Sequence, residues 1–553
     1  MHRNKSAQVH QFAMVPKADI PRSSFRIQKT HKTTFDGGQL IPIWVDEVLP
    51  GDTFTMQMTA FARMATPIYP IMDNLYLESF FFFVPARLLW SNWVKFMGEQ
   101  TNPGDSISYT VPQVVCPVGG YAVGSLQDLM GLPTVGQVGG AATVSHNTLP
   151  CRAYNLIWNS WFRDENLDNS IAVPVTDGPD TAGGTQYVLR RRGKRHDYFT
   201  SCLPFVQKGT AVSLPLGTSA PIKTNATVEQ VTGAQAAMRM VRATGGVPTL
   251  SRGIGTAATA PLTPYTDVGS WTTTPTVSGS FEGLYPSNLY ADLSAATAAT
   301  INQIRQAFQI QKLLERDARG GTRYTEIVRS HFGVISPDAR LQRPEYLGGG
   351  VTPVNISAVA QTSATGLTGA TTPLGSLSAF GTALGHGHAF TQSFTEHGYV
   401  IGLVSVRADL TYQQGLRKMW SRSTRYDFYF PVFAALGEQA VLNSEIYCDG
   451  SANDALVFGY QERWAEYRYN PSQITGLFRS TSAGTLDGWH LSQRFASVPL
   501  LNASFIVDNP PLSRVLAVGA AANGAQFISD FFFDVKAARP LPMYSVPGLI
   551  DHF

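Results

Sequence analysis

A dense group of cations is the part of this sequence best suited to bind a ligand. Five Lys or Arg residues occupy six consecutive positions, and a histidine follows them. These residues are Arg190, Arg191, Arg192, Lys194, Arg195 and His196. Such a run is often a solvated turn, but here the strand-like stretch Asp197–Phe199 follows at once. We therefore expect either contact with phosphate groups or a set of ion pairs with another subunit.

A second group of cations lies near the N-terminus. Residues 1–35 contain seven Lys or Arg and one acid, Asp19, with Phe12 and Phe25 among them. Neutralising phosphates releases counterions, and aromatic rings can stack on unpaired bases. The segment shows no sustained apolar periodicity, which predicts a mobile arm that nucleic acid or a neighbouring subunit orders. The arm cations expected to contact nucleic acid are Arg3, Lys5, Arg22, Arg26, Lys29 and Lys32.

Other residues that could catalyse a reaction or hold a metal do not form a supporting pattern. The sequence has no phosphate-binding P-loop and no G-x-S-x-G motif. His386 and His388 have no carboxylate or thiol nearby in sequence, so a mobile surface loop is favoured over a metal site. Glu165 and Asp168 are expected in a solvated turn or a salt bridge between subunits. We predict no enzymatic activity, no metal and no cofactor.

The composition indicates a large protein, part of whose surface is not meant to be exposed to solvent. Of the 553 residues 44% are hydrophobic and only 15% are charged, against about 25% charged in an average soluble protein. The formal net charge is +3, so any contact with nucleic acid must be local. Four widely spaced cysteines predict free thiols and suit folding in a reducing cytosol. No signal peptide is expected, and no stretch is long and apolar enough to predict membrane insertion.

Runs of alternating or continuous apolar residues predict strands in both halves of the chain. They are Phe54–Met64, Leu75–Val84, Tyr399–Leu410, Arg425–Phe430, Ala455–Tyr460 and Phe527–Val535. Helical spacing is found over Ala295–Arg319, before Gly320 and Gly321, and a shorter helix is expected over Asn155–Phe162. Gly209–Pro286 and Gly348–Gly387 have the composition of loops.

Strands so far apart in sequence predict an all-β protein, an eight-stranded jelly-roll sandwich with very long inter-strand loops and a few helices. We expect one jelly-roll domain over residues 36–553, behind the arm 1–35. It would carry two long insertions, one at about 210–286 and a Gly/Thr-rich loop at about 348–390. A carbohydrate-binding or adhesin module would need an export signal, and a β-rich hydrolase would need a convergent catalytic set. The sequence lacks both features.

Several long segments of the chain resemble the major capsid protein of the microviruses, small tailless phages with circular single-stranded DNA. The gokushovirus branch is most similar, because its coat proteins carry a large insertion before the helix that contains the QIQK and ERDARGG segments. The low-charge stretch Gly209–Pro286 lies at that place. The segments that carry the resemblance are Asn74–Glu99, Arg192–Gly209, Thr300–Val334, Arg343–Gly350 (RPEYLGGG), His397–Arg422 and Pro540–Phe553 (PLPMYSVPGLIDHF).

The resemblance implies a single jelly roll, of which sixty copies form a T=1 shell around single-stranded DNA. It also implies that the insertion forms a protrusion at each three-fold axis that recognises the host, and that the protein is not an enzyme. Expected partners are further copies of the chain, the packaged DNA, a small basic internal DNA-packaging protein, and a host surface receptor such as a glycan. We expect assembly in the host cytoplasm and residence in the virion. In the insertion, the aromatic candidates for packing at its base or stacking on a host sugar are Tyr265, Trp271, Phe281 and Tyr285.

Overall fold

The computed structural model of the chain forms two separate units. One comprises residues 1–208 and 315–553, and the other comprises Gly209–Leu314. The structure describes residues 21–181, 186–212, 222–224, 238–242, 253–254, 284–286, 289–291, 301–335, 342–362, 374–517 and 524–544. The second unit begins where the insertion was predicted to begin, but it extends to Leu314 rather than to Pro286.

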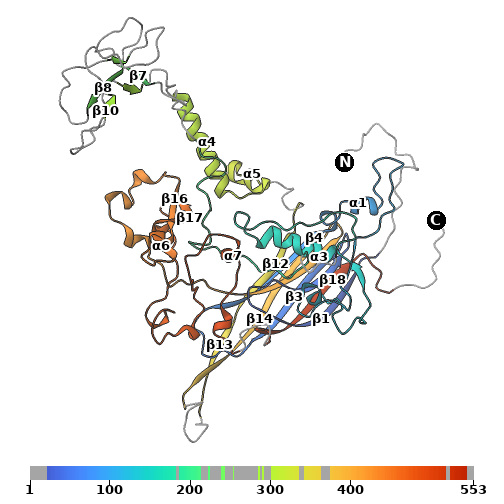
Figure 1. The fold of residues 1–553 in the computed structure, drawn as a ribbon. Coiled ribbons are helices and arrows are strands. Elements are labelled where there is room, and N and C mark those ends of the chain that lie inside the picture. Colours follow the sequence, from blue (N-terminus) through green and yellow to red (C-terminus); the bar gives the residue numbers. More distant parts are fainter. Residues whose placement is uncertain are drawn as a thin grey trace. The chain divides into compact units, whose positions relative to one another are not determined.

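Eight long strands of the first unit form the jelly roll (Figure 1). In spatial order they are β1-β18-β3-β14-β12-β4-β15-β2, and every neighbouring pair is antiparallel. β12 and β14 share only the pair Gly349–Ala389, so the path divides there into two four-stranded sheets. This order confirms the predicted jelly roll. The strands are β1 (Ser23–Phe35), β2 (Ile41–Val48), β3 (Thr53–Met64), β4 (Leu75–Pro85), β12 (Glu345–Pro353), β14 (Leu377–Ser393), β15 (Gly398–Ala408) and β18 (Phe527–Arg539).

The two sheets enclose the main core. Side chains of β3 alternate in burial, with Phe54, Met56 and Met58 inside, because successive residues of a strand point to opposite faces. Each such side chain contributes about 1.5–3 kcal/mol when it is fully buried. The end strands of the path approach each other. Lys29 Nζ lies 5.2 Å from the ring of Trp44, which in turn contacts Phe533 at 4.9 Å between ring centroids.

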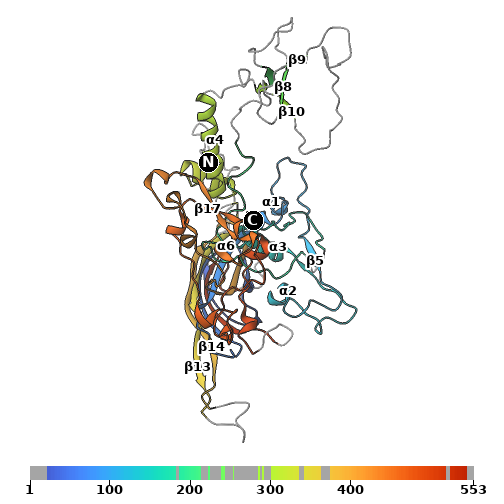
Figure 2. The ribbon, with the colours of Figure 1, turned by 60° about the vertical axis from the view of Figure 1, so that its left-hand side comes forward.

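A second core covers the outer face of β4 and β15. There Phe82 and Ile401 pack with Tyr154 of α3 (Leu149–Ile157), which is followed by a π-helical turn over Trp158–Phe162. β4 is therefore buried on both faces, as its continuous apolar sequence predicts. In Figure 2 the segment with α1, α2, α3 and β5 lies to one side of the strands.

Shorter elements occupy the long connections. In the first unit they are α1 (Trp93–Phe96), β5 (Gln113–Val115), α2 (Leu126–Leu129), β6 (Ser145–Asn147), α5 (Tyr324–Phe332), β13 (Asn355–Ala360), β16 (Glu438–Leu442), α6 (Asn443–Ile446), β17 (Val457–Glu462) and α7 (Ala503–Ile506). The second unit contains β7 (Ile222–Thr224), β8 (Met238–Arg242), β9 (Gly253–Ile254), β10 (Leu284–Pro286) and β11 (Leu289–Ala291). α4 (Ile301–Arg319) crosses the boundary between the units.

Three sequence predictions differ from the structure. Ser23–Phe35 is not part of a mobile arm, because all its residues pair with Phe527–Arg539. The predicted loop at 348–390 contains the end of β12, all of β13 and most of β14. Its glycines and alanines fit a crowded sheet, which composition alone does not indicate. Arg425–Phe430 is not a strand but begins with a 3-10 turn at Arg425–Asp427.

The histidines and cysteines also have structural roles in the folded unit. His388 lies in β14 and is buried between the hydroxyl groups of Ser79 (2.6 Å) and Thr352 (2.7 Å), so it is not in a mobile loop. Within the described ranges no three His, Cys, Asp or Glu side chains are placed to share a metal ion. Burial raises the pKa of the Cys151 thiol to about 12. None of the described helices is long and apolar enough to span a membrane.

Candidate nucleic-acid interface

Backbone hydrogen bonds fix the segment that carries the cation cluster. Arg190 O accepts from Leu40 N at 2.8 Å, and Arg192 N donates to Gly38 O at 3.1 Å. On the other side Lys194 N donates to Ile506 O at 2.7 Å. The cluster is therefore an ordered part of the fold, tied to segments far away in sequence. Residues 198–201 form a turn, so the predicted strand Asp197–Phe199 is wrong.

The three arginines at the start of the cluster have partners inside the unit. Arg190 lies over the ring of Trp158 at 5.8 Å, and burial lowers the pKa of its guanidinium. Arg191 donates from Nη1 to Gly37 O at 2.7 Å. Arg192 forms an ion pair with the buried carboxylate of Glu78. These contacts assign the three side chains to the stability of the jelly roll.

Lys194 is also partly buried. Its Nζ lies 4.5 Å from the ring of Phe505 and 3.4 Å from Gln493 Oε1. Burial lowers the pKa of Lys194 to about 8, and burial raises the pKa of the neighbouring Asp508 to about 6. An anion near Lys194 would favour its charged form.

Arg195 and His196 differ from the rest of the cluster because they are exposed. Within the part of the chain that the structure describes, neither side chain has a hydrogen bond or an ion pair. The backbone oxygen of Arg195 accepts from the Thr200 hydroxyl at 2.8 Å, which holds the loop in place. The side chains of Arg195 and His196 are thus presented to solvent from a fixed backbone.

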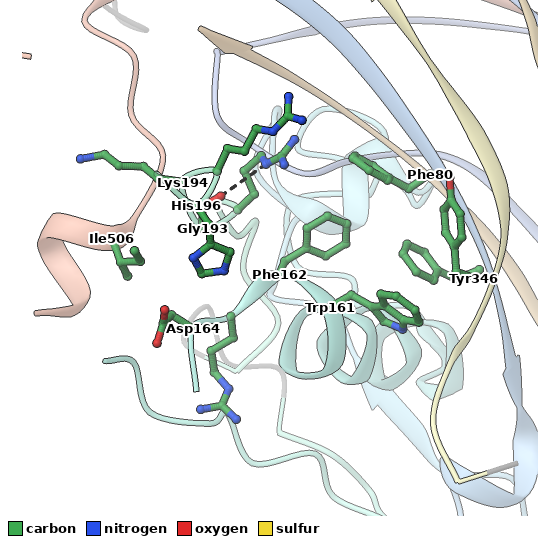
Figure 3. A pocket seen from close by; sticks show the side chains of 13 residues that line it. Phe80, Trp161, Phe162, Asp164, Gly193, Lys194, His196, Tyr346 and Ile506 are labelled. Carbon is green, nitrogen blue, oxygen red and sulfur yellow. Dashed lines mark hydrogen bonds between the residues drawn. The ribbon is translucent and has the colours of Figure 1, made fainter. Parts of the chain in front are cut away.

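These two residues border a cavity of about 340 Å³ (Figure 3). One side of it is aromatic and the other is polar, with Asp164 and the residues 192–196. The ring centroids of Phe80 and Phe162 are 5.1 Å apart, and those of Trp161 and Tyr346 are 6.0 Å apart. The rings come from β4, from the π-helical turn after α3, and from β12. Three distant segments therefore build one aromatic wall.

Two rings of this wall remain accessible. Trp161 is 39% exposed and Tyr346 is 44% exposed, and Arg343 lies 4.8 Å above the Trp161 ring. Accessible rings can stack on bases without sequence preference, and adjacent cations contact the backbone. Asp164 is a lining acid, but it accepts hydrogen bonds from the backbone of Asn166 at 2.9 Å and so caps its own turn. The arrangement is suited to a single-stranded nucleotide segment.

The described cations of the predicted arm, Arg22, Arg26, Lys29 and Lys32, do not line this cavity. Arg26 forms an ion pair with Asp534 at 2.6 Å, and Lys32 lies 3.7 Å from Asp530, both along β1 and β18. Arg22 donates to the Thr53 hydroxyl, and Lys29 covers Trp44. Arg3 and Lys5 lie outside the described residues.

The aromatic residues proposed for the insertion are not located either. Tyr265, Trp271 and Phe281 lie outside the described residues, and of Tyr285 only the backbone, in β10, is described. The acids Glu165 and Asp168 have no catalytic arrangement. Glu165 forms an ion pair with Arg323, within one subunit rather than between subunits.

Sequence reasoning did not assign Trp161, Phe162 and Tyr346 to a site. The crowding of aromatics at the end of Asn155–Phe162 was the available signal, but it predicted only a packed helix. Tyr346 lies in β12, and its approach to Trp161 depends on how β12 pairs with β4.

Comparison with known proteins supports a viral role. The family described as "Capsid protein (F protein)" matches residues 13–549. The proteins named "Capsid protein VP1" of Bdellovibrio phage phiMH2K and of Chlamydia phage 1 are 47% and 44% identical to the chain. The same-named protein of Spiroplasma virus 4 is 38% identical. In each case the alignment covers 98% of this chain and 98% of the relative.

Proposed function

Because the chain belongs to the capsid protein (F protein) family, we propose that sixty copies of it form a closed T=1 icosahedral shell around circular single-stranded DNA. The family places the chain in the virion in a structural role, not in that of an enzyme. The observation that carries the proposal is the jelly roll itself, whose two four-stranded sheets are formed by residues from both ends of the family match.

Several large apolar side chains that are exposed in one segment support assembly from many copies. Trp420 is 68% exposed, Tyr426 is 70% exposed and Val432 is 80% exposed, all within one segment. Trp, Tyr and Arg are the residue types that most often dominate protein interfaces, and Arg417, Arg422 and Arg425 lie in the same segment. A cluster of exposed large apolar residues is a feature of protein interaction sites.

The cavity beside Arg195 is the proposed contact with the packaged DNA. The rings of Trp161 and Tyr346 would stack on bases, and Arg195 and His196 would approach phosphates. The arm residues Arg3 and Lys5 are proposed to add contacts of the same kind. The small basic packaging protein expected from the resemblance would supply further positive charge, since the chain has a net charge of only +3.

The unit Gly209–Leu314 is the proposed host-contact element. It is separate from the jelly roll, which supports a role other than building the wall of the shell. We propose that it forms the protrusion at the three-fold axis and contacts a host receptor such as a glycan.

Electron microscopy of the purified protein and nuclease treatment of its particles test the shell and its cargo. We expect uniform isometric particles that protect circular single-stranded DNA from nuclease. A soluble monomer over a wide range of salt and protein concentration would contradict the shell. Particles that protect only RNA or duplex DNA would contradict the cargo.

A further inference from the structure

In the described part of the chain, strand β13 pairs with a neighbouring strand on one of its two sides only. β13 pairs with β14 from Asn355–Thr382 to Ala360–Leu377, and it pairs with no other strand in the described part of the chain. In both views of the ribbon, β13 and the start of β14 extend away from the other strands (Figures 1 and 2). A two-stranded ribbon alone is at best marginally stable in water.

The backbone groups on this open edge can be identified. Val354 N donates to Leu75 O at 2.8 Å, on the side of the chain that faces away from β14. Because N–H groups alternate in direction along a strand, those of Ile356, Ala358 and Ala360 face the same side. β4 begins at Leu75 and cannot reach them. Among the described residues these three amides have no backbone partner.

β13, β14 and the segment that joins them carry no charged side chain. The sequence has no Asp, Glu, Lys or Arg between Glu345 and Glu396. Residues 357–360 are all exposed, so both faces of β13 are open, and Val359 and Phe380 are each 49% exposed. Proteins usually protect an exposed edge strand with charged side chains, above all lysine.

β1, the strand at one end of the path, is protected in this way. β1 carries Arg26, Lys29 and Lys32, and Lys29 of β1 reaches Trp44 of β2, the strand at the opposite end of the path. β13 has neither charges nor a covering strand. Its sequence and position therefore suit it to accept another strand through main-chain hydrogen bonds.

We propose that the open edge of β13 pairs with an extended segment of a second copy of this chain when subunits assemble. The inference rests on the proposed shell, in which copies of the chain are the abundant neighbours. An uncharged ribbon also fits an uncharged protein surface and not DNA, because binding to DNA requires cations near phosphates. Pairing places the exposed side chains of the ribbon against the neighbour and gives the open amides their partners.

Substitution at Ala358 tests the pairing. Ala358→Pro removes one outward N–H, and proline is tolerated on a strand edge that faces solvent, so the free subunit should keep its thermal stability. Ala358→Thr keeps the N–H and serves as the matched control. We expect the proline variant to lower the yield of shells at least about tenfold and the threonine variant to assemble normally. Equal assembly by both variants, or equal loss, would overturn the proposal.

A second variant covers the case in which Ala358→Pro does not fold. Val359→Lys places a charge on the exposed ribbon without removing an amide, whereas Thr391→Lys places the same charge on an exposed position of β14 within the body of the sheet. We expect only Val359→Lys to block assembly. Normal assembly of Val359→Lys would refute the role of the ribbon, and so would equal loss in the Thr391→Lys control.

Hydrogen–deuterium exchange gives a direct readout on wild-type protein. The amides of Ile356, Ala358 and Ala360 should exchange quickly in the free subunit and at least about tenfold more slowly in the shell. Failure of the wild-type chain to form shells would contradict the proposed function. Shells in which these amides exchange as fast as in the free subunit would contradict the pairing alone.

Discussion

Arg407 Nε lies 2.6 Å from Glu78 Oε1 on the covered outer face of β4 and β15, and Arg192 binds the other oxygen of the same carboxylate. Burial alone would raise the pKa of Glu78, but the two guanidinium groups hold it below its ordinary value. Arg192 therefore belongs to the fold, while its near neighbour Arg195 is free to bind a ligand.

This difference predicts opposite effects of two similar substitutions. Arg192→Ala should lower the free energy of unfolding by about 1.5–3 kcal/mol, because it leaves a buried carboxylate with Arg407 as its one remaining cationic partner. Arg195→Ala should change it by less than about 0.5 kcal/mol, because the side chain is exposed. Urea unfolding of the subunit measures both. Equal stability of the two variants would show that the ion pair of Arg192 has no structural role.

Nucleic-acid binding, in contrast to stability, should depend on the exposed residues of the cavity. Trp161→Ala removes an exposed ring and should weaken binding of an oligothymidylate to the subunit by about 1–3 kcal/mol. Arg195→Ala should reduce the salt dependence of binding by about one counterion. Fluorescence titration at several salt concentrations measures both effects. Arg63→Ala, an exposed arginine on β3, is the control, and a loss of the same size there would mean that binding is unspecific.

The sequence predicted the strands that alternate or are continuously apolar, such as Thr53–Met64 and Leu75–Pro85, because burial against a core leaves that pattern. It did not predict β13 and β14, where small residues replace large ones. The sequence also could not distinguish the structural role of Arg192 from the exposed position of Arg195, because Glu78, the partner of Arg192, lies 114 positions earlier. Pairing over such a distance depends on the register between strands, which one sequence does not reveal.

In the RPEYLGGG segment, Gly349 lies too close to a neighbouring strand to carry a side chain. A Cβ on Gly349 would lie 2.0 Å from the backbone oxygen of Ser79 in β4. Gly349→Ala should therefore lower the free energy of unfolding by about 3 kcal/mol, because β12 must separate from β4. Gly387→Ala is the control: nothing lies within 4 Å, and only its φ of +83° opposes a side chain, at a cost of about 1–2 kcal/mol. Thermal unfolding compares the two variants.

The buried His388 should make stability depend on pH. Burial lowers its pKa below the ordinary value of 6.5, which favours the neutral imidazole in the folded state. Between about pH 6.5 and this lowered pKa the unfolded chain binds more protons than the folded chain, so stability falls as pH falls through that window, by up to about 1.4 kcal/mol per pH unit.

The comparison with His388→Gln isolates this effect from other histidines. Urea unfolding between pH 7.5 and 5 should show a smaller loss of stability in the variant than in the wild type. Parallel curves for the two proteins would mean that His388 does not contribute.

Removal of the second unit should separate assembly from attachment. We predict that a short Gly/Ser linker in place of residues 213–299 leaves shells intact, because the jelly-roll strands all lie outside this range. α4 is kept, since Arg319 at its end forms an ion pair with Glu438 in the first unit. Electron microscopy should show isometric shells, while binding of labelled shells to host cells should fall sharply. Arg63→Ala shells, altered far from the insertion in sequence, should bind cells as the wild type does. Unchanged binding by the deleted shells would refute the receptor role, and a complete loss of shells would assign the unit to assembly.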